Sequence, residues 1–147
     1  MARTRVRDID DPAAWHYWDG AAWTDDAAAA VPVVGEVGAV SQTLSVFPSG
    51  GRWCALSKQD EFRGTALAVW PADHPWGPFG PPTELLSIPC NPATGEVQYM
   101  ALAHPDLLPR PGTMVVSWSR NNLDLAAVCQ DPDLYRPRFE RVRLPAG

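Results

Sequence analysis

Proline is the feature that most constrains what this chain can fold into. Sixteen prolines are spread along its 147 residues, and each removes a backbone donor and breaks a helix interior. Between them lie short runs in which apolar and polar residues alternate, as in half-buried strands. The chain is therefore expected to be all-β. A helical turn is predicted at Asp11–Trp15, and a 3₁₀ turn at Pro105–Leu108.

Four strand-like runs follow one another in the first half of the chain. Val40–Phe47 and Arg52–Ser57 are joined by a Pro-Ser-Gly-Gly turn, which is typical of a hairpin. Thr65–Trp70 and Thr83–Ile88 are separated by a proline-rich loop. Four short antiparallel strands within about fifty residues match one blade of a β-propeller.

A second group of runs begins after the turn at Asn91–Gly95. Val97–Ala103 and Thr113–Ser119 alternate as strands, Leu125–Val128 is a weak third strand, and Phe139–Leu144 is the fourth. In the last run Val142 and Leu144 are expected to point inward. This group predicts a second blade of similar size.

The segment Trp15–Thr24 contains a tight Asp19-Gly20 turn and reads as the outer strand of a preceding blade, with Trp18 and Trp23 packed together. The expected organisation is a lead-in (1–14) and a partial propeller (15–145), divided into the end of a preceding blade (15–34), one blade (35–90) and the last blade (91–145).

The predicted fold class is thus an incomplete β-propeller built of antiparallel four-stranded blades, about two to two and a half of them. Propellers close with four or more blades, so open ends would expose strand edges and apolar faces. We expect a fragment or truncated reading frame that needs missing blades or self-association. The alternative architecture is a small β-sandwich.

The charge pattern argues against several classes of partner. The net charge is −5, and Lys58 is the single lysine beside eleven arginines, so a nucleic-acid footprint is not supported. The longest apolar run, Ala27–Val34, is too short to span a bilayer. No apolar stretch follows the basic N-terminus, so no signal peptide is predicted. The chain is expected to be soluble, and its localisation stays open.

Cys54, Cys90 and Cys129 are odd in number and lack a CxxC spacing, so we expect small buried apolar side chains. No zinc, redox, phosphate-cradle or dinucleotide motif is present, and no metal or cofactor is predicted.

Several motifs resemble those of a known group of proteins. Gly64–Trp70 followed by Pro75–Phe79 resembles a strand and GPW signature of five-bladed propellers, which include arabinanase- and furanosidase-type glycoside hydrolases. His104–Leu107 followed by Val115–Asn122 is similar to a pattern of a related uncharacterised family, and Tyr135–Phe139 resembles its closing strand. The resemblance covers roughly 15–145 and implies a C-terminal portion.

The chain departs from that pattern at two positions. Trp118 stands where a tyrosine is usual, and Arg120 where a small polar residue is expected. A competing resemblance covers only Tyr17–Thr24, which is similar to the core of a short bacterial module often attached to membrane proteins. That match spans about ten residues and is the weaker of the two.

The resemblance to glycoside hydrolases implies chemistry by paired carboxylates. In propellers of that kind the catalytic carboxylates come mainly from the first three blades, which this chain would lack. The resemblance therefore implies carbohydrate binding or processing when complete, without autonomous catalysis. The alternative is a non-catalytic binding or scaffold domain, or a truncated product without activity.

Four ligand-binding candidates carry charge or an imidazole. His104 could bind a hydroxyl, a carboxylate or a metal in a central channel, or it could cap the Pro105 turn. Asp60 and Glu61 could point into a cleft, although adjacent acids in a loop are more often turn formers. Arg120 offers a fork for carboxylate or hydroxyl recognition.

Three further candidates are uncharged. Asn121 and Asn122 could recognise sugar hydroxyls, although an Asn pair also forms good turns. Trp76 could be a stacking platform for a sugar ring, although packing is the favoured interpretation.

Overall fold

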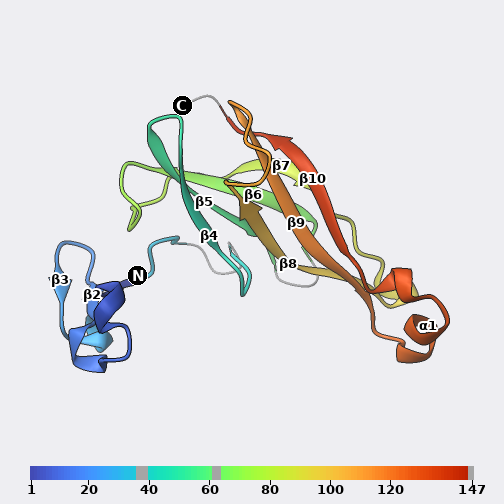
Figure 1. Cartoon of the computed structure of the whole chain (residues 1–147), viewed down its shortest axis with the longest axis horizontal. Helices are drawn as coiled ribbons and strands as arrows, with labels where there is room; N and C mark the ends of the chain where they lie inside the picture. The colour runs from blue at the N-terminus through green and yellow to red at the C-terminus, as the bar shows by residue number, and fades with distance from the viewer. Residues whose placement is uncertain (36–39, 61–63, 146–147) are drawn as a thin grey trace.

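The computed structural model describes residues 1–35, 40–60 and 64–145, and in these ranges the chain is nearly all-β (Figure 1). It forms three antiparallel sheets. The expected all-β class is confirmed.

The N-terminal sheet is small and has the order β1-β2-β3. Its strands are β1 (Ala2–Arg3), β2 (His16–Trp18) and β3 (Trp23–Thr24). The predicted turn before β2 is confirmed as a 3₁₀ turn at Pro12–Ala14, capped by the Asp11 carboxylate, which accepts the Ala13 N–H at 3.0 Å. Two further 3₁₀ turns lie at Val6–Asp8 and Ala27–Ala29.

The second sheet is a four-stranded meander in the order β4-β5-β6-β7. It consists of β4 (Ser45–Ser49), β5 (Arg52–Lys58), β6 (Ala66–Ala72) and β7 (Thr83–Ser87). All four predicted strands are therefore present. β4 begins later than expected, at Ser45.

The third sheet has three strands in the order β10-β9-β8. They are β8 (Glu96–His104), β9 (Thr113–Asn122) and β10 (Pro137–Arg143). The predicted strand at Leu125–Val128 is wrong, because this segment lies in the helix α1 (Leu125–Gln130).

Local chemistry explains the helix α1. The Asp124 carboxylate accepts the N–H groups of Ala126 and Ala127, at 2.9 and 3.3 Å, and so caps the helix. Alanine is also the best helix former. No residue of α1 is buried, so the expectation that all three cysteines are buried is wrong for Cys129, which is exposed.

The two larger sheets pack face to face around the main apolar core. Thr43 Oγ1 donates to the carbonyl of Ala101 at 3.1 Å, and the Ala103 N–H donates to Ser45 Oγ at 3.0 Å, so the start of β4 lies beside β8. At the other end β7 contacts β10. The buried side chains of this interface are Phe47, Cys54, Leu56, Leu67, Val69, Ile88, Ala101, Met114, Val116, Trp118 and Val142.

The opposite side of the four-stranded sheet is also covered. Ala55, Ala68 and Trp70 form a second buried cluster there. They are packed by apolar side chains from the preceding segment, from β4 and from the loop after β6, namely Val34, Val40, Val46 and Phe79. The four-stranded sheet therefore has apolar cover on both sides.

The N-terminal sheet forms a lobe set apart from the two stacked sheets (Figure 1). Trp18 and Trp23 pack together as predicted, with ring centroids 5.4 Å apart. Trp76, from the loop after β6, contacts both rings at 5.9 and 5.7 Å and stacks on His74. Arg3 lies 4.0 Å above the Trp23 ring. This aromatic cluster ties the lobe to the rest of the molecule.

Candidate functional site

The alternation of side chains along β9 divides the third sheet into two faces. Met114, Val116 and Trp118 point into the interface with the four-stranded sheet. The residues between them, Ser117 and Ser119, therefore point to the opposite side, which we call the open face. The register places the strand residues Val97, Tyr99, Leu102, His104, Thr113, Val115, Ser117, Ser119, Asn121, Pro137, Phe139, Arg141 and Arg143 on it.

His104 is joined to two neighbours on the open face. Its Nε2 lies 2.6 Å from Ser117 Oγ, and its ring lies 5.8 Å from the ring of Phe139, tilted by 37°. The Phe139 side chain is 59% exposed, whereas Ser117 is 7% exposed. His104 is thus hydrogen-bonded to the buried hydroxyl of Ser117 and lies beside the accessible ring of Phe139. The His104 carbonyl also accepts the Leu107 N–H at 3.1 Å, so its backbone closes the Pro105 turn while its ring is held by Ser117 of β9.

Asn121 lies further along the same face. Its Nδ2 donates to the hydroxyl of Tyr99 at 3.2 Å.

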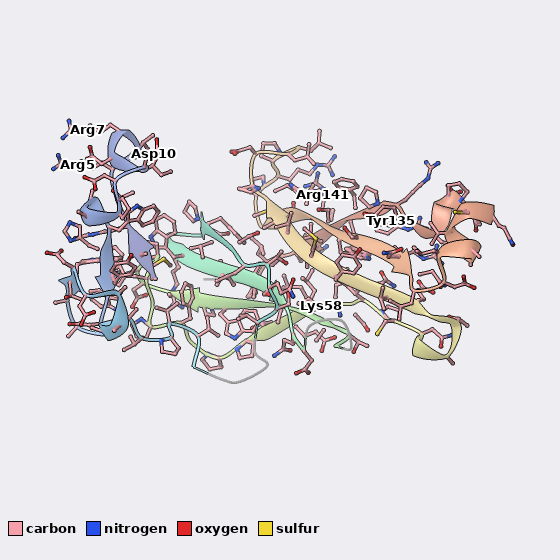
Figure 2. All side chains as sticks on the ribbon, turned by 90° about the horizontal axis from the view of Figure 1, so that it is seen from below. Arg5, Arg7, Asp10, Lys58, Tyr135 and Arg141 are labelled. Atoms are coloured by element: carbon pink, nitrogen blue, oxygen red, sulfur yellow. The ribbon has the colours of Figure 1, made fainter. Side chains whose placement is uncertain are left out.

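Figure 2 shows Tyr135, which is 60% exposed, on the same side of the ribbon as Arg141. Arg141 donates to Thr113 Oγ1 at 3.0 Å and to the Leu108 carbonyl at 2.9 Å, and so holds the loop after β8 at the margin of the face.

Arg120 points to the other side of the sheet. Its Nε donates to Glu96 Oε1 at 2.8 Å, and both side chains are 25% exposed. Gln98 lies opposite Arg120 in the register, and Trp118 Nε1 donates to its side-chain oxygen. Gln98 Nε2 donates in turn to the carbonyl of Pro89. Arg120 therefore belongs to a polar network that borders the interface between the sheets.

Asn122 is a structural residue in this geometry. It is buried, its Nδ2 donates to the Thr94 carbonyl at 2.9 Å, and its Oδ1 accepts the Asp124 N–H at 2.8 Å. These bonds connect the turn before β8 to the start of α1. The period of the strand thus splits Arg120, Asn121 and Asn122, and of these three only Asn121 lies on the open face.

The remaining candidates lie elsewhere. Asp60 is exposed in the turn after β5 and has a φ of 53°, in keeping with a turn former. Glu61 lies outside the described residues. Trp76 is half-buried in the aromatic cluster. The structure therefore brings His104 and Asn121 onto one face and separates them from the other four candidates that it describes.

Sequence reasoning did not single out the two aromatic residues of this face. Phe139 and Tyr99 were treated only as parts of strands. A signal was present for Phe139, because the expected inward orientation of Val142 and Leu144 places odd-numbered residues of the same strand on the outer side.

Two absences hold for the described parts of the chain. Residues 1–35, 40–60 and 64–145 contain no group of three or more side chains able to hold a metal ion. In the same ranges no helix is long and apolar enough to cross a membrane.

The chain matches a family model for a domain of unknown function, DUF5005, over residues 1–144. It belongs to the DUF5005 family. No curated protein matches it. The fold is similar to that of a crystal structure from Bacteroides ovatus ATCC 8483 described as a "putative hydrolase", with a TM-score of 0.71 and 23% identity. The match covers 96% of this chain and 38% of the other, so this DUF5005 chain spans less than half of that protein.

Proposed function

We propose that this DUF5005 chain is a non-catalytic, carbohydrate-binding part of a larger hydrolase-like β-propeller, and that the open face is its binding surface. The observation that carries the proposal is the exposed Phe139 ring beside the His104–Ser117 pair. An exposed aromatic ring suits the apolar face of a sugar. Imidazole and amide groups beside it suit the hydroxyls.

The polar groups extend along the strand rather than converging on one point. Ser117 and Asn121 are four residues apart on β9, which corresponds to about 13 Å at the rise of a strand. A chain of sugars lying along β9 would stack on Phe139 at one end and reach Asn121 at the other. This geometry favours a polysaccharide over a monosaccharide.

Binding is favoured over hydrolysis by the residue types present. Glycoside hydrolysis generally needs two carboxylates on either side of the scissile bond. The strand residues that the register places on the open face include no Asp or Glu. Glu96 and Glu140 lie on the other face of the same sheet. The reaction of a complete protein would therefore depend on carboxylates outside this face.

The propeller part of the proposal is supported by how the sheets stack. The four-stranded meander has the strand count of a blade. The start of β4 lies beside β8, β5 also contacts β8, and β7 contacts β10, so the two sheets stack with their first strands together and their last strands together, as expected for neighbouring blades. Face-to-face packing also occurs in a β-sandwich. In this proposal residues 35–90 and 91–145 are successive blades.

Affinity gel electrophoresis of the purified chain against a panel of plant and bacterial polysaccharides tests the binding function. At least one polysaccharide should retard the protein, and Phe139→Ala and His104→Ala should each raise the dissociation constant about tenfold. Leu125→Ala removes an apolar side chain of α1 that is even more exposed than Phe139 and should change nothing. Absence of retardation throughout the panel would count against carbohydrate binding.

A second candidate function is a scaffold role, in which a further sheet covers the open face. It is favoured by exposed apolar residues of this face on β8 and β10, since Leu102 is 36% and Phe139 59% exposed. This role predicts concentration-dependent association in light scattering, which Phe139→Ala weakens, and no retardation by any polysaccharide.

A further inference from the structure

The hydrogen bonds between β9 and β10 show which backbone groups of β10 point toward its free edge. The Leu144 N–H donates to the Gly112 carbonyl, and the Arg120 N–H donates to the Arg136 carbonyl. With the β9–β10 register, these bonds make Phe139, Arg141 and Arg143 members of non-hydrogen-bonded pairs. Their backbone N–H and C=O groups therefore point away from β9, toward the open edge.

The four-stranded sheet shows what this edge lacks. There, β6 is followed by β7 as the outermost strand. In the third sheet, β10 occupies the position that corresponds to β6, because the segment between β9 and β10 forms α1 and contributes no strand. The outermost position beside β10 is thus empty in the described chain.

A groove lies at that position. It has a volume of about 480 Å³ and runs between β7 and β10, lined by Thr83–Leu86 and Glu140–Pro145. Leu85, Leu86 and Leu144 are half-buried and pack against the main core, so the groove has an apolar floor. An extended segment lying there would bond to the edge of β10 and cover these leucines.

The charges along β10 indicate the chemistry of such a segment. Arg141 and Arg143 lie on the open-face side of the strand, and among the described residues no carboxylate is paired with either. Glu84 and Glu140 line the groove, and Glu140 points to the inner side. Cross-strand pairing therefore favours acidic residues on the outer side and apolar residues on the inner side.

We infer that β10 accepts a fourth strand by β-augmentation, and that the strand is an extended segment of a partner polypeptide in which acidic and apolar residues alternate. Main-chain hydrogen bonds provide affinity in this mode of recognition, and alternate side chains provide specificity. A second copy of β10 fits poorly, because its own residues on the open-face side include two arginines and no carboxylate.

The test is residue-resolved amide hydrogen exchange by NMR on the whole 147-residue chain. In the free protein the amides of Phe139, Arg141 and Arg143 should exchange at least tenfold faster than those of Arg138, Glu140 and Val142. A blocked seven-residue peptide alternating leucine and glutamate, equal in length to β10, should slow the first three amides at least tenfold. A matched leucine–lysine peptide should bind at least tenfold more weakly.

Charge variants sharpen the test. Arg143→Glu should weaken binding of the acidic peptide at least tenfold, whereas Arg5→Glu, in the N-terminal lobe (Figure 2), should leave it unchanged. The inference is overturned if millimolar acidic peptide protects none of the three amides, or if the lysine peptide protects them equally. It is also overturned if protection rises with protein concentration alone, because a second copy would then be the occupant.

Discussion

The four-stranded and three-stranded sheets both contribute one face to the main core, and their far sides end in different environments. The central strands β5 and β6 are largely apolar, whereas β10 mixes apolar and polar residues. The far side of the four-stranded sheet is covered by the chain's own segments, and Trp70 there is only 2% exposed. The far side of the three-stranded sheet leaves Phe139 59% exposed.

The connections between the strands supply this difference in cover. The segment before β4 and the loop after β6 fold back over the four-stranded sheet and bring Val34 and Phe79 onto it. The connection between β9 and β10 is instead a capped helix with no buried residue. The residues of the strands thus determine whether a face is apolar enough to need cover. The loops determine whether this chain supplies that cover.

The largest expected effect is a difference in stability between two variants that each lack one aromatic side chain. Trp70→Ala should lower the free energy of unfolding by about 3–5 kcal/mol, because it empties a buried site on the covered face. Phe139→Ala should change it by no more than about 0.5 kcal/mol, since the ring is largely in solvent. Urea denaturation of both variants measures the difference. Equal losses would mean that the open face is not open in solution.

The next largest effect is a difference in stability between alanine variants of two glycines, each of which precedes a strand of the third sheet. Gly95 and Gly112 have φ values of 75° and 68°, so alanine at either should cost about 1–2 kcal/mol. At Gly95 the new Cβ would also lie 2.7 Å from Asn122 Oδ1, whereas nothing lies within 4 Å at Gly112. Gly95→Ala should therefore be the more destabilising in thermal melts. The reverse order would contradict the anchoring role of Asn122.

A smaller effect is expected at the border of the two sheets. Arg120→Ala removes the ion pair with Glu96, and the loss should be about 0.5–1 kcal/mol because both side chains are partly in solvent. The loss should shrink when the salt concentration is raised toward 1 M. Arg138→Ala, on the exposed edge strand, is the control and should show neither effect. A loss independent of salt would point to packing rather than charge.

The smallest effect concerns pH. Burial raises the pKa of the Cys54 thiol above its ordinary value of 9.0, and Arg52 opposes the shift. The unfolded thiol therefore loses its proton first, so the stability that Cys54 contributes is present below pH 9.0 and falls as the pH rises above it. Denaturation midpoints from pH 8 to 10.5 should fall less steeply in Cys54→Ala than in the wild type. Cys129→Ala should not change the slope, because that thiol is exposed.

Much of the strand content could be predicted from the sequence, because strands leave a period-two pattern that turns interrupt. The hairpin between β4 and β5 follows from Pro-Ser-Gly-Gly, and β9 from the alternation of Met114, Val116 and Trp118. The helix α1 was missed because a six-residue segment is too short to show a helical period. Its signal was the capping residue Asp124.

The candidate site was predictable only in part. His104 and Asn121 were recognised by residue type, which indicates hydrogen-bonding capacity but not orientation. Arg120 and Asn122 are the same kinds of residue and adjoin Asn121, yet they face the other side of the sheet. The register of β8 against β9 separates them, and register depends on pairings between residues distant along the chain.

The sequence by itself determined that this protein is built from short strands, because prolines exclude long helices and alternation requires two-sided sheets. It also determined which residue types are available for binding. Only the tertiary structure decided which face of which sheet is left uncovered, and which edge of β10 lacks a partner. Those properties depend on how loops and distant strands return to one another, and contacts of that kind leave no local pattern in the sequence.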